Sequence, residues 1–273
     1  MNTILLSIAP LSLLQVIAFF FAWVGCWLPL GIVCAIALDW RPPKPLKAEQ
    51  KLPILASLYL IAPLVLWGVS WVIGRSFSDY GFANNPWILS SAGAGFGFAV
   101  LGLAVLFGIQ TALGWVTWQK VQGQQLVSVL LPTLVLALWV SGTEELVFRG
   151  FVFTQIQQDY GSGAAAVISS LIFALLHLVW EQRETMPQLP GLWLMGMVLV
   201  LARYVDGGSL GLAWGLHAGW VWAIASLDSA QLITYTGTGL EWVTGKNGKP
   251  LAGVAGILCL MATGAIIGVV RVR

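Results

Sequence analysis

The residues of this sequence that could carry out chemistry are concentrated in one short segment, residues 141–153, which reads SGTEELVFRGFVF. Glu144, Glu145 and Arg149 lie within six residues of one another, and long uncharged apolar runs flank the segment on both sides. Ionisable groups at membrane depth are costly and usually serve a function. These three side chains are therefore the first candidates for an active site.

Helical spacing separates the two glutamates. Glu145 and Arg149 are four residues apart with the acid first, which favours an ion pair within one helix. Glu144 is rotated by about 100° from Glu145 and has no such partner in its own helix. A desolvated, unpaired carboxylate suits general acid–base catalysis. The alternative interpretation is a polar contact that holds two helices together.

Both histidines of the chain, His177 and His217, also lie in apolar segments. A single histidine in an apolar helix is more often a packed core residue than a ligand. Together with Glu144, however, the two form a set that suits either of two sites: a catalytic site for a divalent metal such as Zn, or a metal-free site with a base and an oxyanion stabiliser.

Three motifs resemble those of the CAAX prenyl protease and bacteriocin-processing family (Abi or CPBP), a family of intramembrane proteases. The segment EELVFR resembles the first motif, EExxxR, and Phe173 to His177 matches the second, FxxxH. His217, in GLHAGW, matches the histidine of the third. The resemblance covers residues 124–227, in the expected order. One position departs from it, because Val221 stands where the family usually has Asn or Asp.

The resemblance implies an intramembrane endopeptidase. Glu144 would activate water. His177 would position that water or bind a metal, and His217 would stabilise the oxyanion or complete the metal set. The remaining motif residues would support the site: Glu145 and Arg149 by holding the helix, and Phe173 by orienting His177. The oxyanion donor missing at Val221 keeps one alternative open, a weakly active or inactive family member that acts as a bacteriocin-immunity or scaffold protein. A third possible class is a proton-coupled transporter that uses Glu144 and the two histidines as a relay.

The composition predicts a polytopic membrane protein. Hydrophobic residues make up 58% of the chain and charged residues 9%, whereas soluble proteins average about 45–50% and 25%. The net charge of +2 is too small to indicate a nucleic-acid partner. We expect an all-α bundle of about eight transmembrane helices in a single domain, residues 1–273. The expected spans are 4–38, 54–74, 87–118, 126–158, 164–180, 191–204, 209–227 and 251–270.

Smaller features complete the expectations. Pro53 disfavours an earlier start of the second span. Glycines at 93 and 97, and at 211, 215 and 219, are spaced for close helix packing. The three cysteines match no ligand pattern. The basic loop 39–52 is the best cytoplasmic candidate, in a protein expected in a bacterial-type cell or inner membrane. The expected partners are the bilayer and a membrane-embedded or lipidated peptide.

Overall fold

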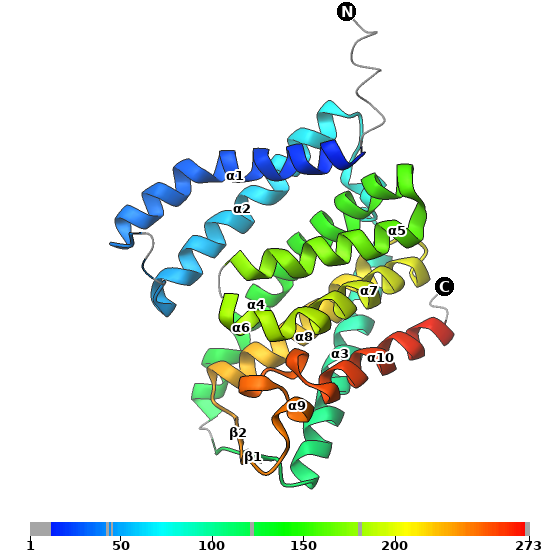
Figure 1. The fold of residues 1–273 in the computed structure, drawn as a ribbon. Helices are drawn as coiled ribbons and strands as arrows, with labels where there is room; N and C mark the ends of the chain where they lie inside the picture. The colour runs from blue at the N-terminus through cyan, green and yellow to red at the C-terminus, as the bar shows by residue number, and fades with distance from the viewer. Residues whose placement is uncertain (1–11, 42–43, 45, 121–122, 180–181, 271–273) are drawn as a thin grey trace, which may run out of the picture.

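Long apolar helices make up most of the chain in the computed structural model, which describes residues 12–41, 44, 46–120, 123–179 and 182–270. Figure 1 shows the helices stacked obliquely across the molecule, with α1 beside α2. The long helices are α1 (Ser12–Ala37), α2 (Ala48–Val72), α3 (Trp87–Ala112), α4 (Gly123–Glu144), α5 (Phe153–Leu176), α7 (Leu189–Val205), α8 (Gly211–Ser229) and α10 (Val254–Val269).

Short elements join them. The π-helix η2 (Glu145–Val152) connects α4 to α5, and η1 (Phe77–Tyr80), η3 (His177–Val179), η4 (Met186–Gln188), η5 (Lys246–Gly248) and η6 (Pro250–Ala252) are 3₁₀ turns. The helices α6 (Gln182–Thr185) and α9 (Glu241–Thr244) are single turns. Strands β1 (Val116–Trp118) and β2 (Ile233–Tyr235) pair antiparallel, with Thr117 opposite Thr234.

The predicted all-α membrane bundle is confirmed. Within the described ranges, five segments are long and apolar enough to cross a membrane, whereas the sequence predicts about eight spans. They are Ser12–Ala37, Glu49–Val72, Trp87–Ala112, Leu126–Val179 and Gln182–Val205. Two predicted spans merge in the fourth of these, and Val254–Val269 is an apolar helix of less than span length.

The merged segment bends at Gly161. This residue has φ of +75° inside α5, a conformation that glycine adopts without steric cost. The chain reverses there, so that the second half of α5 carries His177 back toward the motif. The break predicted at residues 159–163 is therefore confirmed, although the helices on both sides belong to one element. The predicted ends at residues 4–11 and at Trp180 lie outside the described part.

Close packing of α8 on α3 depends on glycines, which place no side chain between the two helices. A Cβ added at Gly215 would lie 1.9 Å from the carbonyl oxygen of Ala92, and one at Gly95 would lie 2.5 Å from that of Leu212. The predicted stripe on α8 is confirmed. The prediction for Gly93 and Gly97 is wrong, because nothing lies within 4 Å of a Cβ at either position; Gly95 faces α8 instead.

We expect Gly215→Ala to destabilise the bundle by at least about 1–3 kcal/mol, the usual cost of overpacking, because its methyl group would enter the backbone of α3. Gly97→Ala is the matched control, since it adds the same methyl group in open space and should leave stability unchanged or slightly improved. The midpoint of thermal unfolding in detergent measures both. Equal midpoints for the two variants would contradict the helix contact described here.

Two sequence expectations about secondary structure are corrected. The helix α2 begins at Ala48, before Pro53, because the side chain of Gln50 accepts the backbone N–H of Lys47 at 3.0 Å and closes its first turn. The span predicted to end at Trp118 ends at Ala112. Its last residues form β1, whose backbone groups pair with β2, more than 110 residues later in the chain.

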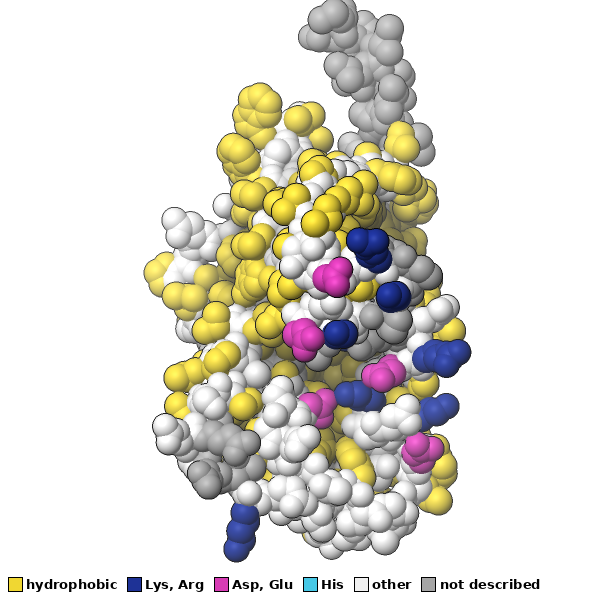
Figure 2. Space-filling view, turned by 90° about the vertical axis from the view of Figure 1, so that its left-hand side faces the viewer, with side chains coloured by type: hydrophobic (Ala, Val, Ile, Leu, Met, Phe, Trp, Pro, Cys, Tyr) yellow, Lys and Arg dark blue, Asp and Glu magenta, His cyan; other side chains and the backbone are white. Residues whose placement is uncertain are grey.

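The surface separates by polarity. On the face in Figure 2, hydrophobic side chains cover much of the upper part, whereas Lys, Arg, Asp and Glu gather across the middle and lower parts. Exposed apolar side chains include Phe21 and Ile36 of α1, each 75% exposed. Contiguous apolar surface of this kind suits contact with lipid.

Candidate active site

The motif segment forms a fully buried π-helix. All eight residues of η2 are buried, and the N–H of Phe153 donates to the carbonyl of Phe148, five residues earlier. Such widened turns interrupt regular hydrogen bonding and often occur at functional sites. Arg203 of α7 fixes this one, because its Nη1 donates to the backbone carbonyl of Arg149 and, at 3.1 Å, to Thr154 Oγ1.

Glu145 is a structural acceptor at the centre of the site. Its Oε1 accepts Arg149 Nη1 at 3.0 Å, and both side chains are at most 1% exposed. The predicted ion pair within the helix is therefore confirmed. The same oxygen lies 2.8 Å from Nδ1 of His217, a contact the spacing did not reveal. Because a carboxylate only accepts, His217 carries a proton on Nδ1.

Glu144 has partners from other helices. The hydroxyl of Tyr59, on α2, donates to its Oε1, and its Oε2 lies 3.4 Å from Nε2 of His217. Glu144 is 5% exposed. Arg149 forms its ion pair with Glu145 and not with Glu144, as the helical spacing predicted.

His177 is held by the residue one turn before it. Its Nδ1 lies 2.8 Å from the carbonyl oxygen of Phe173, and the two rings meet edge to face with centroids 4.6 Å apart. A carbonyl only accepts, so Nδ1 of His177 is the donor and Nε2 of the neutral ring keeps its lone pair. The Phe173 ring in turn packs under the guanidinium of Arg149, with Cζ 4.2 Å from its centroid.

One cavity of about 530 Å³ brings the three predicted chemical residues together. Glu144, His177 and His217 all line it, as do Tyr59 and Val221. Its remaining wall is mainly apolar, and includes Leu103, Leu106, Val140, Leu192, Met195, Trp220, Ile224, Leu251 and Leu260. The arrangement places a carboxylate and two imidazoles in a site of low polarity, where charges interact strongly.

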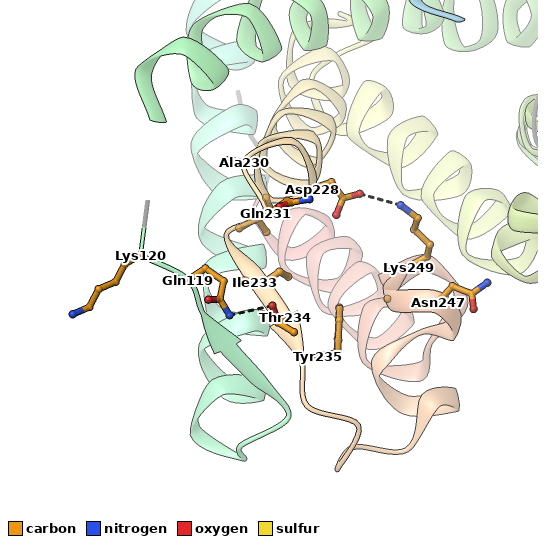
Figure 3. Close-up of a pocket in the computed structure, with 12 residues that line it drawn as sticks. Gln119, Lys120, Asp228, Ala230, Gln231, Ile233, Thr234, Tyr235, Asn247 and Lys249 are labelled. Carbon is orange, nitrogen blue, oxygen red and sulfur yellow. Dashed lines mark hydrogen bonds and ion pairs between the residues drawn. The ribbon is translucent and has the colours of Figure 1, made fainter. Parts of the chain in front are cut away.

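A second, larger hollow of about 830 Å³ lies outside this cavity and contains none of the predicted site residues. Asp228 and Lys249 line both spaces, and they form an ion pair of 2.9 Å. Figure 3 shows the pair beside Tyr235 and Asn247, with Lys120 pointing away. Burial, and secondarily Asp228, raise the pKa of Tyr235 to about 12. The ion pair marks where the polar surface meets the apolar cavity.

The metal set is incomplete in this arrangement. Glu144 Oε2 and His217 Nε2 are 3.4 Å apart, which suits two neighbouring ligands of a Zn ion at about 2.0–2.2 Å each. Among the described residues, however, no three His, Cys, Asp or Glu side chains form a group that could hold a metal ion. The predicted third ligand, His177, lines the cavity without joining the other two.

The central segment of the chain matches a known family. Residues 125–223 match the family described as type II CAAX prenyl endopeptidase Rce1-like. Over that segment, the chain is similar to this family. Searches of curated proteins and of solved structures found no match. The matched segment is thus similar to CAAX-type prenyl endopeptidases, and the apolar helices of the chain make it an integral, multi-pass membrane protein.

Two residues of this site were not predicted from the sequence. Tyr59 lies 85 residues before Glu144, and a single tyrosine in an apolar run gives no signal of its own. Arg203 did give a signal, as an isolated cation at the end of an apolar segment, but that position equally suits a helix end at the membrane surface. Only the fold brings these two side chains to the motif.

Proposed function

We propose that this chain hydrolyses a peptide bond inside the membrane, with Glu144 as the general base. The observation that supports this most strongly is the division between the two glutamates. Glu145 already forms an ion pair with Arg149 and accepts a hydrogen bond from Nδ1 of His217. Glu144 faces the cavity with no cation from its own helix, and is free to take a proton from a water molecule.

The two histidines have different roles in this mechanism. In this mechanism Nε2 of His177, which lines the cavity, accepts a hydrogen bond from the attacking water and orients it toward the carbonyl carbon. His217 is oriented by Glu145 in the way that a buried carboxylate orients a catalytic histidine. When both of its nitrogens are protonated, its Nε2–H stabilises the oxyanion of the tetrahedral intermediate.

The reaction then proceeds without a metal. Water gives a proton to Glu144 while its oxygen bonds to the carbonyl carbon, and the carbonyl electron pair moves to oxygen. When that pair returns, the C–N bond breaks and Glu144 passes the proton to the leaving amine. The two glutamates thus divide base chemistry and positioning between them.

The cavity wall favours an apolar substrate. Its aliphatic and aromatic lining suits a membrane-embedded segment or a lipidated peptide, and the family description names CAAX prenyl endopeptidases. We propose such a peptide as substrate, with the bilayer as the surrounding partner and no nucleic acid. A bacterial-type cell or inner membrane is the proposed location.

We expect the purified protein to cleave a farnesylated, internally quenched CAAX peptide in detergent micelles, and to keep this activity after dialysis against EDTA. The reason is that the described side chains supply a base and an oxyanion donor but no three-ligand metal group. Fluorescence release before and after dialysis measures the effect. Loss of activity that Zn²⁺ restores would replace this mechanism by a metal-assisted one.

The alternative of an inactive family member predicts a different outcome. The position of Val221 favours it, because this cavity residue has no hydrogen-bond donor in its side chain. An inactive protein would fold, insert and leave the farnesylated peptide and its unmodified counterpart intact. Cleavage of either peptide that depends on Glu144 excludes the immunity or scaffold role as the sole function.

A further inference from the structure

Tyr59 is the polar side chain that α2 contributes to the catalytic cavity. It lies on α2, outside the segment that matches the family, and its hydroxyl donates to Oε1 of Glu144. It lines the same cavity as Glu144, His177 and His217. Its hydrogen-bond donor therefore already points at the group that starts the reaction.

The position of Tyr59 is held by α1. Two tryptophans of that helix hydrogen-bond the two residues that precede Tyr59: Trp23 Nε1 donates to the carbonyl of Leu58, and Trp27 Nε1 donates to Ser57 Oγ, both at 2.9 Å. Donors that are fixed in place before the reaction stabilise developing charge at little reorganisation cost. The α1–α2 pair thus presents a preorganised hydroxyl to the site.

One cavity residue on α8, Val221, offers no such group. Val221 is one helical turn after His217 and lines the cavity, but its side chain neither donates nor accepts a hydrogen bond. An oxyanion usually needs more than one donor. His217 supplies one from α8, and Tyr59 is the hydroxyl in direct contact with Glu144.

We propose that Tyr59 is a catalytic residue that donates a hydrogen bond to the oxyanion, and so supplies from α2 the donor that Val221 lacks; this inference rests on the proposed function. Before the reaction the Tyr59 hydroxyl binds the Glu144 carboxylate. When Glu144 takes the proton from water, the negative charge moves from that carboxylate to the carbonyl oxygen of the substrate. The hydroxyl of Tyr59 then donates its hydrogen bond to this oxygen instead of to Glu144, and it keeps its proton.

Removal of the Tyr59 hydroxyl tests this role. Tyr59→Phe should lower kcat for the farnesylated peptide by about 100–1,000-fold, the usual cost of one oxyanion donor, and leave KM unchanged. Tyr204→Phe is the matched control, because Tyr204 is 81% exposed and should keep full activity. In the Tyr59→Phe background, Val221→Asn places an amide donor in the same cavity and should restore at least part of kcat.

A second readout does not depend on activity. Thermal unfolding of Tyr59→Phe, Glu144→Gln and the double variant should be non-additive, because the two side chains are in contact. Additive effects, or wild-type kcat in Tyr59→Phe, would overturn the proposal. A loss of kcat that Val221→Asn does not restore would make Tyr59 a positioning residue and overturn its oxyanion role. Full activity of Glu144→Gln would instead overturn the proposed function.

Discussion

Glu144→Gln is expected to abolish peptide cleavage in protein that folds and inserts normally. The substitution keeps the shape of the side chain and lets it remain a partner of Tyr59 and His217, but an amide cannot take a proton from water. We expect kcat to fall by about 100–10,000-fold, the range for loss of a general base. Cleavage of the farnesylated peptide measures the activity, and the thermal midpoint verifies folding.

The matched control for this variant is Glu184→Gln. Glu184 is also a glutamate but lies in α6, outside the cavity, and should keep full activity. Wild-type turnover in Glu144→Gln would show that the chemistry depends on another group. Loss of folded protein in Glu144→Gln would assign this residue to the polar contact between helices that was the alternative interpretation.

Glu145→Gln is expected to destabilise the fold by about 3–5 kcal/mol, the cost of leaving a buried charge without its partner. Arg149 is 1% exposed and its ion pair is with Glu145, so its cation would lose the compensating carboxylate. We expect a lower midpoint of thermal unfolding and a lower yield of folded protein. The double variant Glu145→Gln/Arg149→Met removes both charges and should recover most of the stability.

The double variant also separates folding from catalysis. We expect the double variant to recover stability but not kcat. The carboxylate of Glu145 accepts a hydrogen bond from Nδ1 of His217 and so orients that imidazole ring, and the neutral amide of glutamine should not hold the ring in the same way. Unchanged stability in Glu145→Gln would contradict the buried ion pair. Full activity in the stable double variant would contradict the proposed orientation of His217.

Local spacing predicted much of the site. The i,i+4 relation assigned Arg149 to Glu145 and not to Glu144, and the structure shows the same pairing. The glycines of α8 predicted close packing on one side of that helix, which leaves His217 to face the motif from the other side. These relations follow from the geometry of a single helix, so they can be predicted from the sequence.

Relations between distant segments could not be predicted in this way. The contact of Tyr59 with Glu144 depends on how α2 packs against α4, and the pairing of β1 with β2 depends on backbone groups more than 110 residues apart. The π-helix also gave no signal, since side-chain periodicity over eight residues hardly distinguishes it from an α-helix. The choice of Gly95 over Gly93 and Gly97 likewise depends on the rotation of α3 against α8.

The proposed mechanism requires that water activated by Glu144 cleaves a peptide bond in this cavity. Mass spectrometry of the farnesylated CAAX peptide, incubated in H₂¹⁸O with wild-type protein and with Glu144→Gln side by side, tests it most directly. We expect only the wild type to cleave the peptide, at one bond and with one ¹⁸O in the new carboxyl group. An intact peptide after incubation with folded wild-type protein, or the same labelled product from Glu144→Gln, would contradict it.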